Sequence, residues 1–439
     1  VIDMPDELAM LKYSKQAYDC SPLREDLEVV GKAPPKDNPI PAKVGGTSPI
    51  KHVIYVIREN RTYDQVLGDM KAGNGAPNLC IFPEKITPNA HQLSRQFVLL
   101  DNFYCDGEVS AEGHEWSMGA YCTDFVRRVW PLKYRGGANK KFDLYPAEAH
   151  FDEIARPAGG YIWDRCAEAK VTYRNYGEWI ENGKTLKDPG TPRVKSLEGH
   201  YDPWYVGFGL DYRDEFRADR FISELQRFEK EGGMPQLSIV KLPNDHTQGQ
   251  KVGKPTPTAM VAENDLALGR IVEGLTKSKF WPETAIFVIE DDAQNGSDHV
   301  DAHRTVALCI SPYTQHGKVD STMYSTASML RTMELILGLR PMSQFDAAAR
   351  PMYASFQTRP NLQPYEHRAP ETDRAAVNLA SAWGAKVSET FDFSEEDLVD
   401  DLLLGEVVWR SVRGADSPMP PPVRAAFVFP HLPKESEKK

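Results

Sequence analysis

A short apolar run that ends in three acidic residues constrains this sequence most. Residues 285–289 (Ala-Ile-Phe-Val-Ile) are apolar and mostly β-branched or aromatic, which predicts a strand buried on both faces of a sheet. Glu290, Asp291 and Asp292 follow directly and place adjacent carboxylates at the end of that strand. Because buried negative charge is costly unless it is compensated, a cation is the expected partner. A polar loop with a turn at 295–296 is the alternative that this stretch leaves open.

The acidic loop does not fit a calcium loop of the EF-hand type. Counting from Asp291, position three is Ala293 and position twelve is Ala302, so two ligand positions lack an oxygen-bearing side chain. Any ion held here therefore needs ligands from elsewhere in the chain.

Composition limits the class of protein. A chain of 439 residues with 41% hydrophobic content can bury a large core in one domain or two. A net charge of −11 argues against nucleic acid or an anionic membrane surface as the main partner. No apolar run approaches the roughly 20 residues of a membrane span, so no integral membrane segment is expected. The six cysteines show no metal-finger spacing, and we assign no disulfide pairing.

Strand and helix patterns alternate along the chain and predict an α/β fold: a mostly parallel sheet with helices on both faces. The predicted strands are 51–58, 96–104, 171–176, 236–242, 285–289 and 305–311. The predicted helices are 111–128, 161–169, 219–230, 258–276 and 325–337. Residues 129–160 and 180–215 lack regular periodicity, which predicts long loops over one end of the sheet, the usual place for a pocket wall.

Both ends of the chain differ in composition from its middle. Residues 1–49 are polar and Pro-rich and predict a linker or N-terminal arm, and residues 414–439 predict a C-terminal tail. The main folded domain is then 50–413. The sequence starts at Val1 rather than Met, and its first fifty residues resemble a linker. We therefore expect a processed part of a longer exported polypeptide, periplasmic or extracellular.

Polar residues collect after the predicted strands, at the edge where open α/β sheets place their sites. Four groups share this position: Glu59 with Asn60, Ser110 with His114, Asp245 with His246, and Asp291 and Asp292 with His299 and His303. Four of these residues offer side-chain oxygens, which suit a hard or borderline divalent ion: Glu59, Asn60, Asp291 and Asp292. The Ser110 hydroxyl would complete the set of ligands. Asp245, His246 and His303 offer a mixed nitrogen and oxygen set that is closer to the preference of zinc.

Ser110 has two interpretations. A serine before a helix is normally its N-cap, and the helical pattern starts at 111. Alternatively, its hydroxyl points into a site where a metal ion and the helix dipole both favour the alkoxide, which makes it a nucleophile.

Two long stretches resemble a known family. Residues 52–64 (HVIYVIRENRTYD) and 290–304 (EDDAQNGSDHVDAHR) are similar to signature stretches of bacterial phosphoesterases, a family of the alkaline phosphatase superfamily that includes phospholipase C and acid phosphatase enzymes. The resemblance runs from about 50 to 340. Residues 110–114 (SAEGH) also resemble the nucleophile segment of nucleotide pyrophosphatases, where Thr leads a Thr-x-x-Asn-His run. This implies an alkaline-phosphatase-like α/β fold with long loop insertions over the site, and 50–413 as its phosphoesterase catalytic domain.

The resemblance also implies roles for single residues. It implies a metal set of Glu59, Asn60, Ser110, Asp291 and Asp292, and it places Asp245, His246 and His303 where second-metal or phosphate-facing residues lie. One divalent ion (Ca, Mn, Mg or Zn) is expected. A second is left open because position 249, where superfamily members often carry the His of an Asp-x-x-x-His run, is a glycine. The residues before 50 resemble the linker after a β-propeller in fused relatives, so a propeller fused at the N-terminus of the full-length protein is left open.

The implied activity is metal-dependent hydrolysis of phosphate mono- or diesters through a Ser110 phosphoenzyme. His246 or His303 would protonate the leaving oxygen. Arg61 or Arg304 would pair with phosphate oxygens, or else form a structural ion pair. The expected substrate is a small phosphate ester or a phospholipid head group.

Two alternatives have different requirements. A sulfatase-like hydrolase needs a Cys/Ser-x-Pro-x-Arg run, which residues 110–114 lack. A metal-stabilised binding domain without enzymatic activity would need the ion but not Ser110.

Overall fold

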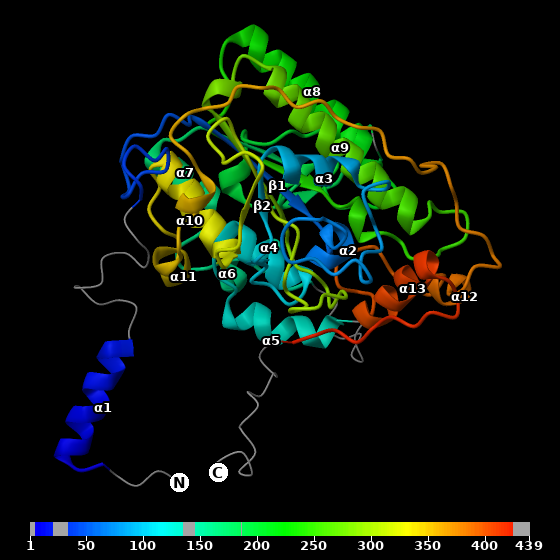
Figure 1. Cartoon of the computed structure of the whole chain (residues 1–439), viewed down its shortest axis with the longest axis horizontal. Helices are drawn as coiled ribbons and strands as arrows, with labels where there is room; N and C mark the ends of the chain where they lie inside the picture. Colours follow the sequence, from blue (N-terminus) through cyan, green and yellow to red (C-terminus); the bar gives the residue numbers. More distant parts are fainter. Residues whose placement is uncertain (1–4, 21–33, 135–144, 186, 425–439) are drawn as a thin grey trace.

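The centre of the sheet forms where the sequence is richest in β-branched and aromatic apolar residues. β1 (His52–Arg58) lies between β7 (Leu237–Leu242) and β8 (Thr284–Glu290) and is parallel to both. The computed structural model describes residues 5–20, 34–134, 145–185 and 187–424 (Figure 1).

One large sheet of seven strands has the order β10-β2-β9-β8-β1-β7-β4. β9 is antiparallel to both of its neighbours, and the other pairs are parallel. The remaining strands of this sheet are β2 (Val98–Leu100), β4 (Tyr173–Tyr176), β9 (Leu308–Ile310) and β10 (Lys318–Asp320). Two small pairs also form: β3 (Phe103–Tyr104) with β11 (Tyr324–Ser325), and β5 (Ile180–Glu181) with β6 (Thr191–Pro192).

Helices cover both faces of the large sheet, which confirms the predicted mostly parallel α/β fold. Alternate residues of β1 enter different cores: Val53, Tyr55 and Ile57 pack under α4, α7 and α10, whereas Ile54 and Val56 pack under α3, α8 and α9. The helices are α1 (Glu7–Cys20), α2 (Tyr63–Leu67), α3 (Pro88–Gln96), α4 (Ser110–Gly119), α5 (Asp124–Lys133), α6 (Asp152–Ala155), α7 (Ile162–Ala169), α8 (Asp214–Glu231), α9 (Pro257–Lys277), α10 (Thr326–Leu337), α11 (Gln344–Ala348), α12 (Ala385–Ser388) and α13 (Asp401–Arg413). None of the helices in the described ranges is long and apolar enough to cross a bilayer.

Several sequence predictions differ from the structure. The strand predicted over 96–104 is two short strands, β2 and β3, which belong to different sheets. The helix predicted over 111–128 is two helices, because Ala120 takes the left-handed conformation (φ 50°) after α4 and Thr123 caps α5. The N-cap of α4 is Val109, and Ser110 is the first helical residue, so the N-cap prediction for Ser110 is wrong.

The ends of the chain are described only in part. Residues 1–49 contain a helix, α1, that the linker prediction did not include, and residues 1–4 and 21–33 lie outside the described residues. Most of the predicted tail, 425–439, also lies outside them. The domain boundaries stay a prediction.

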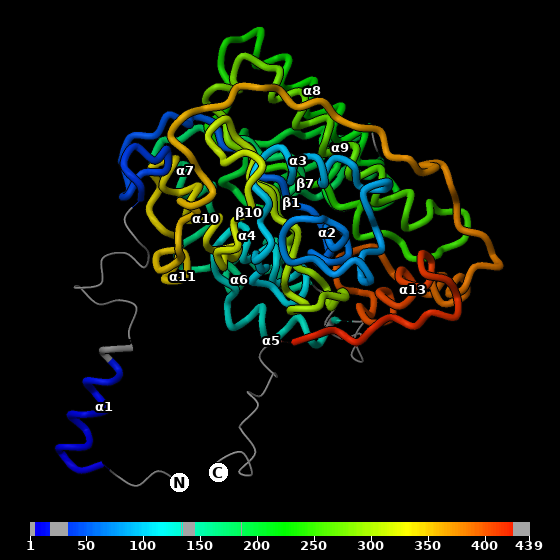
Figure 2. Tube along the Cα trace, viewed as in Figure 1, coloured from blue at the N-terminus to red at the C-terminus, as the bar shows by residue number. Residues whose placement is uncertain are grey.

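The chain after α11 wraps around the body and returns to the carboxyl end of the central strands (Figure 2). It first passes α9, where the Tyr365 amide donates to Thr276 Oγ1 at 3.0 Å. It then runs through α12 to α13, where Asn295 Nδ2, in the loop after β8, donates to Asp401 Oδ2 at 3.3 Å. Residues far apart in sequence therefore meet above the ends of β1 and β8.

A glycine lets α4 pack directly on the chain that follows β8. A Cβ atom at Gly113 would lie 2.6 Å from the carbonyl oxygen of Asp291 and 2.7 Å from its carbonyl carbon. Both are backbone atoms that cannot rotate away, so only glycine permits this approach.

The substitution Gly113→Ala is expected to destabilise the fold by about 1–3 kcal/mol, because α4 must move away from Asp291. Gly274→Ala is the matched control on α9: its nearest neighbours would lie 3.6 Å away, which is ordinary contact. That control is expected to stabilise the protein by about 0.5–1 kcal/mol. Urea unfolding of both variants tests the contrast, and a Gly113→Ala variant as stable as the wild type would contradict it.

Candidate active site

The ends of β1 and β8 bring the two predicted acidic groups together. Arg58 pairs in register with Glu290, so Glu59 and Asp291 leave adjacent parallel strands at the same level. Glu59, Asn60, Asp291 and Asp292 are all buried. Asn60 takes φ 72°, a left-handed conformation that asparagine tolerates better than most residues.

Most side-chain oxygen atoms of these residues lack donors. Within the described part of the chain, neither carboxylate oxygen of Glu59 or Asp291, nor Asp292 Oδ1, nor Asn60 Oδ1 accepts a hydrogen bond. Burial raises the pKa of Asp291 to about 7 and raises that of Asp292 well above its ordinary value. Buried oxygens without donors fit a divalent ion, which would compensate their charge and their missing hydrogen bonds.

Ser110 lies beside these oxygens at the start of α4. Its hydroxyl donates to Asp292 Oδ2 at 2.9 Å. The backbone N–H groups of Ser110 and Ala111 donate to the two carboxylate oxygens of Asp397, at 3.0 and 2.7 Å. The N-terminus of α4 therefore already holds a carboxyl group, supplied by the segment between α12 and α13.

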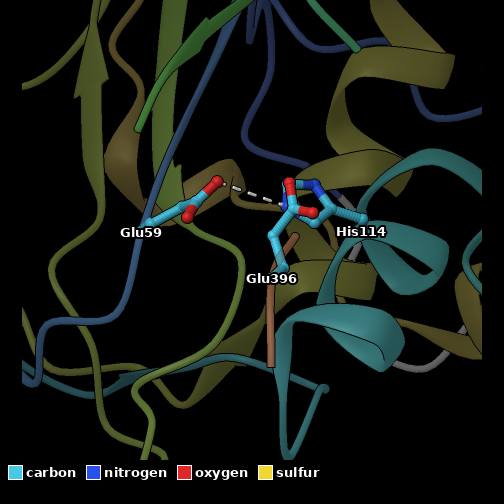
Figure 3. Close-up of side chains that lie close together, drawn as sticks. All are labelled: Glu59, His114 and Glu396. Carbon is cyan, nitrogen blue, oxygen red and sulfur yellow. Dashed lines mark ion pairs between the residues drawn. The ribbon is translucent and has the colours of Figure 1, made fainter. Parts of the chain in front are cut away.

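His114, one turn along α4, lies between the two strand ends. Its Nε2 is 3.5 Å from Glu59 Oε1 and 3.5 Å from Asp291 Oδ2, and its Nδ1 is 3.1 Å from Glu178 Oε2. Burial and Lys241 lower the pKa of His114, but the surrounding carboxylates, Glu178 first, outweigh them and hold it well above the ordinary value. His114 is thus a buried cation among carboxylates (Figure 3).

A second buried cation, Lys241 on β7, completes the group. Its Nζ lies 3.0 Å from Glu396 Oε1, 3.1 Å from Glu148 Oε1 and 3.6 Å from Glu59 Oε1. Burial alone would raise the pKa of Glu148, but Lys241, His114 and Arg193 lower it to about 2. Figure 3 shows how Glu59, His114 and Glu396 converge from β1, α4 and the C-terminal segment.

Asp245 and His246 lie at the end of β7, next to this group. Asp245 Oδ2 pairs with the Arg58 guanidinium at 3.0 Å, and Arg58 also pairs with Glu290 at 3.2 Å, so this carboxylate belongs to a buried ion-pair group. The His246 ring is buried, and its Nδ1 is 2.9 Å from the Thr247 carbonyl oxygen. The predicted metal and acid roles of these two residues stay predictions.

His303 and Arg304 are held by other partners. His303 is partly exposed, with Nε2 2.8 Å from Glu108 and Nδ1 2.7 Å from Asp301. The buried Arg304 guanidinium pairs with Asp298 and Asp64, each at 3.0 Å. For Arg304 this geometry favours the structural ion pair that the sequence left open, and the catalytic roles of both residues stay predictions.

Sequence reasoning missed four residues of the group: Glu148, Glu178, Lys241 and Glu396. Two of them carried a signal. A lysine inside an otherwise apolar strand (Lys241) needs a buried partner, and Glu178 follows a predicted strand just as Glu59 does. Glu148 and Glu396 lie in irregular segments whose position no local pattern indicates.

Several solved structures are similar to this chain, each at low sequence identity. One is a protein in the alkaline phosphatase superfamily from Vibrio parahaemolyticus, with 16% identity, a TM-score of 0.48 and coverage of 79% of this chain and 78% of the other. The lipoteichoic acid synthase LtaP from Listeria monocytogenes has 11% identity, a TM-score of 0.44 and coverage of 89% and 97%. Murine ectonucleotide pyrophosphatase/phosphodiesterase 5 has 13% identity, a TM-score of 0.35 and coverage of 55% and 56%. These TM-scores lie below 0.5, and the α/β fold is established by the sheet and helices themselves.

Sequence similarity gives the family. No curated protein matches the chain. The sequence model of the Phosphoesterase family matches residues 77–340, more than half of the chain and most of the strands and helices that build the site. The matched range includes 290–304 but not 52–64, and it confirms the family that the resemblance predicted: the chain belongs to the Phosphoesterase family.

Proposed function

We propose that the protein is a metal-dependent hydrolase of phosphate esters in which Ser110 is the nucleophile. One observation carries the proposal: the Ser110 hydroxyl donates to Asp292 at 2.9 Å, beside buried carboxylate oxygens that lack donors. Membership of the Phosphoesterase family supports the same reaction class. The substrate we propose is a small phosphate mono- or diester, of the kind that acid phosphatases or phospholipases C hydrolyse, met outside the cytoplasm.

Glu59, Asn60, Asp291 and Asp292 would hold the divalent ion. When bound, such an ion supplies Lewis-acid polarisation and neutralises negative charge at the reacting group. Asp292 orients the Ser110 hydroxyl by accepting its proton in a hydrogen bond. His114 keeps Glu59 and Asp291 from repelling each other by lying 3.5 Å from both.

The transfer has two steps. The Ser110 oxygen attacks phosphorus and passes its proton to Asp292, which accepts its hydrogen bond, while the bond from phosphorus to the leaving oxygen breaks. The leaving oxygen takes a proton from His246 or His303, the proposed donors. Water then attacks the phosphoserine and gives a proton back to that histidine, while the bond from phosphorus to the Ser110 oxygen breaks and this oxygen takes the proton from Asp292. A monoester substrate thus releases phosphate, and a diester releases a phosphate monoester. A phosphoryl oxygen in this position would take over the N–H groups of Ser110 and Ala111 that Asp397 holds in the free protein.

Metal binding is expected to raise the melting temperature, because an ion that binds only the folded state stabilises it by about 2.7 kcal/mol at 100 times its dissociation constant. Asp291→Asn should lose most of this gain in a Mn²⁺ titration of metal-free protein. Asp265→Asn is the matched control, since Asp265 is an equally buried carboxylate that accepts from the Asn89 and Ala90 N–H groups. The control should start less stable but keep the gain, and a full gain in Asp291→Asn would contradict the metal assignment.

Ser110→Ala is expected to lower the turnover of an aryl phosphate by several orders of magnitude, which corresponds to more than about 4 kcal/mol in barrier height. Ser110 is not the N-cap, so the loss of its bond to Asp292 should cost only about 1 kcal/mol of stability. Ser110→Thr should retain some activity because it keeps a hydroxyl. Ser117→Ala, a buried serine on the same helix, is the control and should stay within a few-fold of the wild type. Wild-type turnover in Ser110→Ala with intact metal content would exclude Ser110 as the nucleophile.

Asp397→Ala should tighten inhibition by inorganic phosphate about tenfold, or 1.4 kcal/mol, because it frees two backbone donors at the α4 N-terminus. Asp400→Ala is the control: Asp400 accepts from the Leu403 N–H as the N-cap of α13, and its loss should leave the inhibition constant unchanged. Equal inhibition constants for Asp397→Ala and the wild type would show that phosphate does not use these donors.

A further inference from the structure

The carboxylates of the site fall into two groups with different partners. Asp291 and Asp292 lie with Asn60 at the ends of β1 and β8, and most of their side-chain oxygens lack donors among the described residues. Glu148 and Glu396 instead hold the ammonium group of Lys241. Glu59 belongs to both groups, since it lies 3.6 Å from Lys241 and 3.5 Å from His114.

Lys241 is placed for this contact by the pairing of β7 with β1. It lies in register with Ile57, two residues before Glu59, and its side chain is fully buried. A buried ammonium group is costly unless several acceptors surround it, and here three carboxylates do. The ring of Phe208 covers the group, 5.6 Å from Nζ.

The oxygens that surround Lys241 are also those that an additional ion would need. Glu59, His114 and Glu396 each offer a ligand atom within 4.8 Å of the others, a spacing that suits a metal ion. Two of these three residues contact Lys241 Nζ, so the ammonium group and such an ion would compete for the same oxygens. Because Lys241 is part of the chain, its ammonium group occupies this position without having to bind from solution.

We propose that Lys241 is a built-in second cation of the site, which fills the Glu148–Glu396 half and limits the protein to one divalent ion, held in the Asp291–Asp292 half. This inference rests on the proposed metal-dependent function. Lys241 is then a positioning residue, because its Nζ lies 3.6 Å from Glu59 Oε1 and holds that carboxylate. Glu396 comes from beyond residues 77–340, so the C-terminal segment supplies part of this arrangement.

The test counts bound Mn²⁺ per chain, by elemental analysis after dialysis, and records the electron paramagnetic resonance spectrum. Wild type is expected to hold one isolated ion. Lys241→Ala, folded in the presence of Mn²⁺, should hold two ions with a spin-coupled spectrum, because the freed carboxylates accept the additional ion. Lys241→Arg keeps the charge and should hold one. Lys254→Ala is the control for loss of a paired lysine, since Lys254 pairs with Asp211 at the surface, and it should also hold one.

Each result separates this inference from the proposed function. One ion in both wild type and Lys241→Ala would overturn the role of Lys241 while leaving the function in place. Two ions in wild type would overturn it directly, and this count decides the matter even if Lys241→Ala does not fold. No bound ion in an active wild type would instead refute the metal-dependent function on which the inference rests.

Discussion

Parallel pairing of β1 with β8 is the constraint on which the rest of the site depends. It sets Arg58 against Glu290, and the residues that follow, Glu59 and Asp291, must then leave the sheet side by side. Two carboxylates this close and this deeply buried repel each other unless positive charge lies between them. The protein places His114 there, and α4 can bring it so close only because Gly113 has no side chain.

The three consecutive acids at the end of β8 have different partners because successive residues point to different sides. Glu290, still in the strand, faces Arg58, which also binds Asp245. This buried ion-pair group compensates the charge of Glu290 and fixes the end of β7 against β1. Asp292 accepts from Ser110 instead, and Asp291 faces His114. One short run of sequence thus supplies a buried ion pair with Arg58 and the carboxylates that contact Ser110 and His114.

Sequence alone predicted those parts of the protein that follow from local periodicity. The buried strands 51–58, 236–242 and 285–289 were recognisable from their apolar runs, and their parallel order placed Glu59, Asn60, Asp291 and Asp292 at one edge. The partners of the charges were not predictable in this way. Arg304 and Asp298 are close in sequence, but Lys241 and Glu396 are brought together only by the tertiary fold. The split between α4 and α5 was missed because Ala120 carries no usual sign of a helix end.

Burial of Ser110, the proposed nucleophile, affects how a substrate would reach it. Ser110, Asp291 and Asp292 have no exposed surface in the free protein. The residues that contact the N-terminus of α4 and Lys241 from the C-terminal side are neighbours, Asp397 and Glu396. A phosphate ester brings negative charge of its own, and it cannot share two backbone donors with the Asp397 carboxylate. Under the proposed function, each turnover therefore requires Asp397 to release these two N–H groups. The free energy gained when a phosphoryl group binds the Ser110 and Ala111 N–H groups must then exceed the free energy lost when Asp397 leaves them. This difference contributes to the affinity for the substrate.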